Sequence, residues 1–236
     1  MSPRARTLLV AFLLVTAGVC ARLGVWQRDR LHRRRAANQL ALAARSAPPL
    51  TLPAGSTPLA DRRVVASGRY DRAHEVVLRN QSWNGSPGVY VVTPLRLGGS
   101  DTAVLVNRGF VSAPDAMTAS LDSLDEPGDV RVTGIAQSMD SRDGGGPIVH
   151  GGRTTWRRLD VPALRRRLPY VLLGAVIRQA PDSALPRTPS RLEAPPLDDG
   201  PHLSYMLQWF GFAATALVMA VVVLRQPQGT GALRSS

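Results

Sequence analysis

The stretch LSYMLQWFGFAATALVMAVVVL, residues 203–224, holds 22 consecutive residues without a formally charged side chain. At a rise of about 1.5 Å per residue, a helix of this length crosses the roughly 30 Å of hydrocarbon in a bilayer. The stretch lies far from the N-terminus, which excludes a signal peptide. We therefore expect a membrane-spanning helix that begins at His202.

A second apolar stretch lies near the N-terminus of the sequence. It runs from Thr7 to Ala21 and reaches membrane length when it continues through Trp26. The arginines ahead of it would also suit a signal peptide. However, the next segment, LGVWQRDRL (residues 23–31), keeps apolar residues at helical spacing. This continuation favours an uncleaved anchor.

The two stretches predict a two-pass membrane protein that holds one domain between two α-helical anchors. The intervening residues suffice for one compact domain with a core. The expected division is a cytoplasmic N-terminus at 1–6, a transmembrane helix at 7–26, an extracytoplasmic domain at 27–201, a second transmembrane helix at 202–224 and a cytoplasmic tail at 225–236.

Short strand-like segments fill the central domain. They are rich in β-branched residues and are separated by Gly, Pro, Asn and Asp. No long helix separates them, so we predict a mainly antiparallel sheet or a small barrel, and an α+β domain. The expected elements are an arginine-rich helix at 23–44, a loop at 46–61, strands at 64–70, 76–81, 88–97, 102–111, 130–136, 156–159 and 170–179, a hairpin turn at 97–101, a short helix at 161–168 and a Pro-rich linker at 180–201.

The net charge of +12 comes from arginine alone, because the sequence contains no lysine. Such a composition indicates a base-composition bias of the genome. Aromatic residues make up only 5% of the chain and do not alternate with the arginine runs at 28–35 and 165–167. Nucleic-acid binding is therefore not expected, whereas anionic lipid headgroups suit these runs. The only cysteine, Cys20, excludes an internal disulfide framework.

The sequence lacks the signatures of the common enzyme classes. There is no nucleophile elbow, phosphate-binding P-loop, HExxH or CxxC motif. His150-Gly151-Gly152 has no nucleophile motif to accompany it and is interpreted as a turn. The acidic residues within 115–129 do not follow the order of an EF-hand, which favours a solvated loop. We expect a protein that is not an enzyme.

His202 stands at the start of the second apolar stretch and is followed by Tyr205, Gln208 and Trp209. Positions 202, 205 and 209 share one face of a helix, and 208 lies near it. A histidine at a membrane boundary is a haem or metal ligand, a proton carrier or a wet interfacial side chain. Because Tyr and Trp are ordinary residues of the headgroup belt, location alone favours the interfacial role.

Five segments together carry a resemblance to a known family. They are LGVWQRDRL (23–31), GRY (68–70), LRNQSWNGSPGVYVVTPLRL (78–97), VLVNRGFV (104–111) and HLSYMLQWF (202–210). In their order and in the position of both anchors they resemble the Surfeit-locus-one family, and the resemblance covers almost the whole chain. Members of that family are membrane proteins that assist the assembly of haem-copper cytochrome oxidase.

The resemblance implies an assembly factor for cytochrome c oxidase that binds or hands over haem a at the membrane boundary. In bacterial relatives a histidine at the start of the second span is implicated in binding haem a. Here that residue is His202, which would ligate the haem iron, with Tyr205 and Trp209 near the macrocycle. The implied partners are cytochrome c oxidase subunit I and haem a synthase.

Two other functional classes stay open. A scaffold would hold oxidase subunits or other membrane proteins together without touching haem, and replacement of His202 separates it from a haem-binding factor. A membrane-anchored hydrolase would need a nucleophile and a base, and the sequence shows neither.

The arginine-only composition and the short segment ahead of the first span favour the plasma membrane of a bacterium over a mitochondrion. The resemblance also implies a membrane protein with its central domain facing outward. The arginine count near the first span points the other way. Five arginines lie within residues 28–35, directly after that span, and the positive-inside rule would place them in the cytoplasm. The orientation implied by the resemblance is the one we expect.

The glycines and polar residues of the resembling segments have structural explanations. Gly68, Gly88 and Gly109 are expected at turns or bulges. Four polar residues beside the predicted strands either tie loops together or face a partner, and the sequence does not choose between the two. They are Asn80, Gln81, Asn107 and Arg108.

Overall fold

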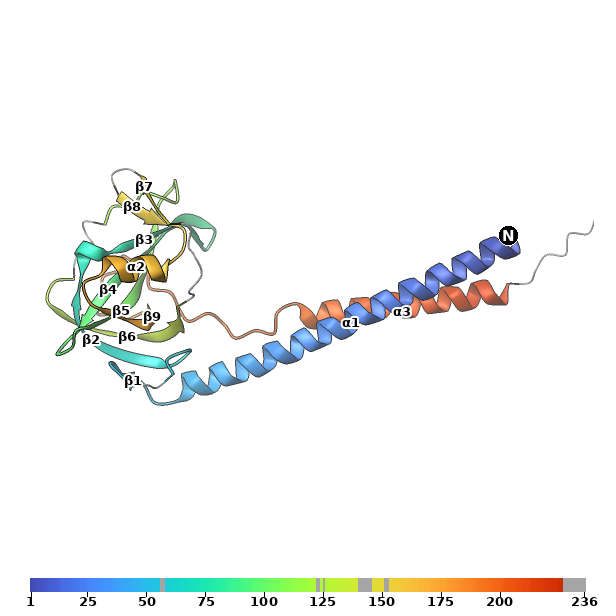
Figure 1. The fold of residues 1–236 in the computed structure, drawn as a ribbon, viewed down its shortest axis with the longest axis horizontal. Helices are drawn as coiled ribbons and strands as arrows, with labels where there is room; N and C mark the ends of the chain where they lie inside the picture. The colour runs from blue at the N-terminus through green and yellow to red at the C-terminus, as the bar shows by residue number, and fades with distance from the viewer. Residues whose placement is uncertain (56–57, 122–123, 125, 140–145, 151–152, 227–236) are drawn as a thin grey trace, which may run out of the picture. The chain divides into compact units, whose positions relative to one another are not determined.

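The computed structural model describes residues 1–55, 58–121, 124, 126–139, 146–150 and 153–226 (Figure 1). In sequence order, a β-rich region lies between two long helices. The helices are α1 (Pro3–Ser46), α2 (Val161–Arg167) and α3 (His202–Arg225), with a 3-10 turn η1 (Arg72–His74). The strands are β1 (Leu50–Thr51), β2 (Arg63–Tyr70), β3 (Val76–Trp83), β4 (Ser86–Leu97), β5 (Thr102–Ser112), β6 (Asp129–Ser138), β7 (Pro147–His150), β8 (Arg153–Trp156) and β9 (Val171–Gln179).

The chain divides into two compact units. The helical unit comprises residues 1–39 and 197–236, and the β unit comprises residues 40–196. Helices α1 and α3 are both long and apolar enough to cross a membrane. The prediction of two apolar helices that flank a β-rich domain is therefore confirmed. The first anchor and the arginine-rich helix after it form one uninterrupted helix, because no Gly-Pro break or capping residue separates them.

Within the helical unit, α1 and α3 lie side by side and run in opposite directions (Figure 1). At one end the Arg6 guanidinium donates to the carbonyl oxygen of Leu224. At the other end the Arg35 guanidinium contacts the Asp199 carboxylate at 2.8 Å. The contact between the helices is therefore antiparallel along the whole length of α3.

Small side chains form the seam between these two helices. The buried positions recur at alternating spacings of three and four residues, as expected for a helix pair with a heptad-like seam. On α1 they are Ala17, Cys20, Gly24, Gln27 and Leu31, and on α3 they are Ala213, Ala216, Ala220 and Val223. A Cβ at Gly24 would lie 2.7 Å from the Phe210 ring, so a glycine is required for this approach. Small residues are the usual means by which apolar helices pack closely in a bilayer.

The centre of the β unit is a closed ring of five strands. The order β2–β6–β9–β5–β4 returns to β2, because β2 pairs with β6 along its length and also with β4 at Gly68–Tyr70. Of these five pairings, only β5 with β9 is parallel. We predicted either a mainly antiparallel sheet or a small barrel, and the structure shows the small barrel. Closure removes the free edges of an open sheet and encloses a core of mainly Val, Leu and Ala side chains.

Gly68 makes the closure of the barrel possible. A Cβ on this residue would overlap the carbonyl oxygen of Arg96 on β4. Gly88 serves a similar close approach, in this case against β5. The prediction of a turn or bulge is wrong for these two glycines, since both lie inside strands where two backbones meet. It is confirmed for Gly109, which has a φ of 129° beside an irregularity in the β4–β5 register.

Strands outside the ring extend one side of the barrel. β3 forms a hairpin with β4 through Asn84-Gly85, both at positive φ as a tight hairpin turn requires. β8 then pairs with β3, and β7 with β8. The predicted strand at 156–159 is largely wrong. Only Trp156 belongs to β8, because Asp160 accepts a hydrogen bond from the Ala163 amide and starts α2 directly afterwards.

Strand β7 and the turn η1 were not predicted, whereas most other elements of the β unit lie close to their predicted positions. The turn at 97–101 joins β4 to β5, and α2 ends one residue before the predicted boundary. The two-residue β1 lies within the segment predicted as a loop. The Pro-rich segment 180–196 is extended and packs on β5, where Ser190 and Phe110 exchange two backbone hydrogen bonds.

Candidate functional site

His202 is the first residue of α3, and α1 presents its partner. Its Nδ1 lies 2.9 Å from Oε1 of Gln27, which is 8% exposed on the seam of α1. Gln27 belongs to the same segment, LGVWQRDRL, that carried part of the resemblance. Sequence reasoning missed this partner, because 175 positions separate the two residues and only helix packing brings them together.

The hydrogen bond decides which nitrogen of the His202 imidazole is available. A side-chain amide oxygen only accepts hydrogen bonds, so Nδ1 is the donor in this pair. In the neutral ring, Nε2 then carries the lone pair. A histidine that donates through one nitrogen and offers the other is the arrangement found in most histidine ligands of metal ions.

Gly200 lies beside the ring edge that carries Nε2. Gly200 has a φ of 65°, and a Cβ built on it would lie 3.7 Å from Nε2 of His202. Any larger residue at 200 would therefore place side-chain atoms against that edge of the ring. The glycine also suits the left-handed backbone that turns the chain into α3.

Charged contacts hold the chain just before His202. Arg34 and Asn38 on α1 both donate to the carbonyl oxygen of Asp198, at 3.1 and 2.7 Å. The Arg35 guanidinium binds the Asp199 carboxylate beside them. Each exposed pair contributes little to stability by itself. Together they fix the register of residues 198–199, and so the position of His202 at the end of the helix pair.

The other two predicted site residues flank His202 along α3. Trp209 is half-buried and continues the seam on which His202 lies, whereas Tyr205 is 46% exposed. The Trp209 ring packs edge-on against Phe212, with centroids 5.9 Å apart. His202 and Trp209 therefore share the α1-facing side, and Tyr205 borders it.

This arrangement offers a single imidazole whose Nδ1 is engaged by Gln27 and whose Nε2 has no hydrogen-bonding partner among the described residues. Among the described residues, no group of three His, Cys, Asp or Glu side chains is arranged to hold a metal ion. Arg22 and Arg28 are exposed on the same stretch of α1, and Arg28 contacts only the neighbouring Asp29, at 3.5 Å. The described residues thus offer one imidazole at this end of the helix pair, and exposed guanidinium groups on the same stretch of α1.

The polar residues of the central motifs have different surroundings. The Arg108 guanidinium is fully buried and contacts Glu75 at 3.2 Å and Glu126 at 2.8 Å. It also donates to the carbonyl oxygen of Leu124 and lies under the Tyr70 ring, 4.9 Å from its centroid. Burial, together with Glu126, raises the pKa of the Tyr70 hydroxyl above its ordinary value.

This cluster identifies Arg108 as a structural residue. Arg191, from the Pro-rich segment, joins it through a 2.6 Å contact with Glu126. Asn107 accepts a hydrogen bond from the amide of Gly109 and so also serves the fold. Of the two predicted roles, tying loops together or facing a partner, Asn107 and Arg108 therefore have the first.

Asp71, His74 and Tyr170 form a second group of titratable side chains in the β unit. The Asp71 carboxylate accepts from the Tyr170 hydroxyl at 2.9 Å and contacts His74 Nδ1 at 2.8 Å. Burial alone would raise the pKa of Asp71, yet the hydrogen bonds from His74 and Tyr170 outweigh it and hold that pKa below its usual range. Burial and the bond to Asp71 raise the pKa of Tyr170. The group joins η1 to the start of β9.

Comparisons with known proteins agree with the resemblance seen in the sequence. The model of the SURF1 family matches residues 14–214. A SURF1-like protein of Monosiga brevicollis is 28% identical over 96% of this chain and 90% of its own. Surfeit locus protein 1 of Rattus norvegicus is 25% identical, covering 86% of this chain and 71% of its own, and a SURF1-like protein of Rickettsia felis is 24% identical, covering 90% and 95%.

Proposed function

This chain belongs to the SURF1 family, and on that premise we propose that it is an assembly factor for haem-copper cytochrome c oxidase that binds or hands over haem a at the membrane boundary. The observation that carries the proposal is the His202–Gln27 pair. Gln27 engages Nδ1 of the imidazole, and among the described residues Nε2 has no hydrogen-bonding partner.

The residues at this end of the helix pair fit haem. Neutral imidazole is a strong axial ligand of haem iron, and bound haem a would supply the redox centre of the oxidase. His202 Nε2 is the ligand in this proposal, Gln27 fixes the ring that carries it, and Tyr205 and Trp209 provide apolar surface. A single protein ligand suits a carrier, because the affinity must be low enough for release.

The proposed surroundings are a bacterial plasma membrane, with α1 and α3 inserted and the β unit on the outer side. The proposed partners are oxidase subunit I and haem a synthase. A cysteine scan tests the orientation. In a C20A background, S183C places a thiol on an exposed residue of the β unit. A membrane-impermeant maleimide should label it in intact spheroplasts, and labelling only after lysis would reverse the orientation.

The haem proposal is tested with the purified full chain in detergent. After expression in cells that make haem a, the wild-type protein should carry an a-type absorption band. H202A should lose that band, while H32A, which removes an exposed histidine from α1, should keep it. Equal haem a content in H202A and the wild type would contradict the proposal.

A second readout distinguishes the carrier from a scaffold. Membranes of cells that depend on this protein should lose the a-type signal in reduced-minus-oxidised spectra when H202A replaces the wild type, with b- and c-type signals intact. A scaffold without haem would retain full oxidase in H202A membranes, provided the variant inserts at normal levels.

A further inference from the structure

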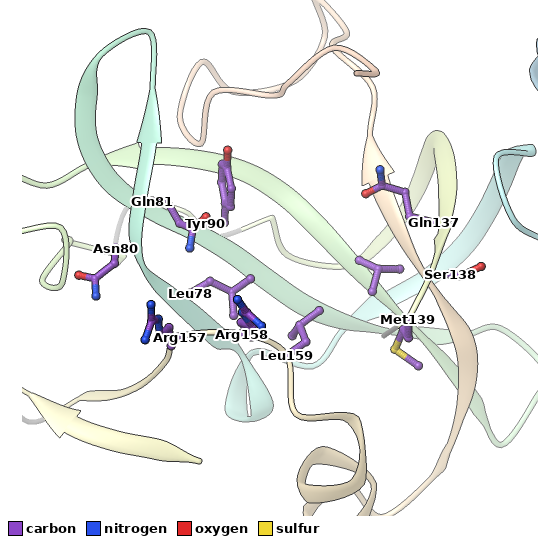
Figure 2. Close-up of a pocket in the computed structure, with 11 residues that line it drawn as sticks. Leu78, Asn80, Gln81, Tyr90, Gln137, Ser138, Met139, Arg157, Arg158 and Leu159 are labelled. Atoms are coloured by element: carbon purple, nitrogen blue, oxygen red, sulfur yellow. The ribbon is translucent and has the colours of Figure 1, made fainter. Parts of the chain in front are cut away.

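A pocket in the β unit lies apart from His202 and carries motif residues that the proposed function does not use. Its volume is about 560 Å³. The hairpin strands β3 and β4 form one side, the end of β6 with β9 forms the other, and residues 157–159 cross between them (Figure 2). A volume of this size is typical of sites for small molecules rather than for protein partners.

The pocket has an apolar floor and a polar, cationic rim. The floor is formed by side chains of Leu78, Tyr90, Met139, Leu159 and Val176. The rim carries the amides of Asn80, Gln81 and Gln137, the Ser138 hydroxyl and the guanidinium groups of Arg157 and Arg158. Among the described residues that line the pocket, none is acidic. The lining therefore complements a ligand that has an apolar body and an anionic group.

The two guanidinium groups are available for such a ligand. Arg157 and Arg158 are exposed, and neither forms an ion pair or hydrogen bond with another described residue. Most other described arginines of the β unit make hydrogen bonds, ion pairs or ring contacts. Arg79, for example, donates to the carbonyl oxygen of Thr155 at 3.0 Å. Two adjacent unpaired guanidinium groups match the geometry with which arginine binds carboxylate or phosphate oxygens.

One of the polar lining residues, Asn80, stands at a β-bulge. Asn80 has a φ of 58° at an irregularity in the β3–β4 register between Leu78 and Gln81. A bulge of this kind turns a side chain away from the regular alternation of a strand. The Asn80 amide makes no hydrogen bond with another described side chain, although its backbone N–H donates to Ala116. Strained positions of this kind are found preferentially at ligand sites.

We propose that this pocket binds a small amphipathic acid. Its apolar body would lie on Tyr90, Met139 and Val176, and its carboxylate or phosphate oxygens would accept hydrogen bonds from Arg157 and Arg158. The Asn80 and Gln81 amides border the same end of the pocket as Arg157 (Figure 2). The Gln81 amide already donates to the carbonyl oxygen of Arg79 at 2.9 Å, so the Asn80 amide would be the group that distinguishes an oxygen-rich headgroup from a simple ion. This site is independent of the haem proposal, because it lies wholly within the β unit.

The test is photolabelling of the full chain in detergent with 4-benzoylbenzoate, which joins an apolar photoreactive body to a carboxylate. Mass spectrometry should place the adducts chiefly on the peptides that contain Met139 and Tyr90. The neutral analogue 4-benzoylbenzamide should label these peptides at least about tenfold less, since charge-assisted hydrogen bonds to two arginines are lost.

Variants of equal charge complete the test. R157Q/R158Q should lower the labelling by at least about tenfold, whereas R165Q/R166Q, which removes two exposed arginines from α2, should leave it unchanged. Competition by octanoate would indicate a free organic acid as the natural ligand, and competition by octyl phosphate alone a lipid phosphate. Labelling that is spread over the chain, or that both double variants reduce equally, would overturn the proposal.

Discussion

The β unit and the helical unit each hold a polar side chain from a motif, and these two side chains find different numbers of hydrogen-bonding partners. In the barrel, Arg108 contacts two carboxylates and a backbone carbonyl oxygen, and its guanidinium is fully buried. In the helix pair, His202 makes one side-chain hydrogen bond, to Gln27, and its Nε2 has no hydrogen-bonding partner among the described residues.

This difference separates a structural residue from a candidate ligand. A buried charge must find its partners within the protein, because desolvation without them costs several kcal/mol. Arg108 meets that condition and has little left to offer to another molecule. His202 is oriented by one contact and keeps one lone pair, which is the property that a ligand needs. The comparison predicts opposite consequences when each residue is replaced.

Replacement of Arg108 should have the largest effect. R108M leaves Glu75 and Glu126 without their shared partner, and removal of one side of a buried ion pair costs about 3–5 kcal/mol. The free energy of unfolding of the β unit, measured by urea titration of the full chain, should fall by that amount. R69Q, which removes an exposed pair with Asp129, should cost less than about 1 kcal/mol. An equal loss in the free energy of unfolding in R108M and R69Q would contradict a structural role for Arg108.

Closure of the barrel is the next most sensitive feature. G68A puts a methyl group against the carbonyl oxygen of Arg96 and should destabilise the β unit by roughly 1–3 kcal/mol or more. G98A is the matched control, because its Cβ would lie 4.0 Å from the nearest atom, the Ser67 carbonyl oxygen. Thermal unfolding should distinguish the two. A wild-type midpoint for G68A would show that β2 and β4 do not approach so closely.

Replacement of Gln27 tests the helical side of the comparison. Q27L removes the acceptor that orients His202, and loss of such a partner typically lowers metal affinity about 10–100-fold. Haem a retained by the purified protein should fall accordingly, while the urea midpoint of the β unit stays at the wild-type value. Q27E, which keeps an acceptor oxygen, should retain more haem than Q27L. Unchanged haem content in Q27L would show that the hydrogen bond between His202 and Gln27 is not needed for haem binding.

The smallest effect is a pH dependence in the β unit. The folded-state pKa of Asp71 lies below its ordinary value of about 4, so the charged carboxylate stabilises the fold above that pH, and this contribution is lost as the pH falls through the folded-state pKa. The stability difference between the wild type and D71N should be constant at neutral pH and shrink below about pH 4. Urea midpoints at pH 3 to 7 measure it, and a difference that grows on acidification would contradict the assignment.

Helix and strand positions could be predicted from the sequence wherever a local pattern decides them. An uncharged run of 22 residues and alternating β-branched segments leave few alternatives for 203–224 or for β4 and β5. The misassigned strand at 156–159 failed because an N-cap aspartate, Asp160, outweighed the strand propensity of the residues before it. The proposed site could be predicted only in part from the sequence. His202 stands out because it begins the second apolar stretch, whereas no local pattern marks Gln27 as its partner.

By itself, then, the sequence determined the two apolar helices, the β-rich unit between them, the absence of a disulfide framework and the family. Its local patterns depend on neighbours within a few residues, and those are fixed by the order of the chain. The tertiary structure alone decided the closure of the barrel at Gly68, the burial of Arg108 between Glu75 and Glu126, and the pairing of His202 with Gln27. Each of these depends on atoms brought together by packing across long separations in sequence, and no local pattern encodes such a contact.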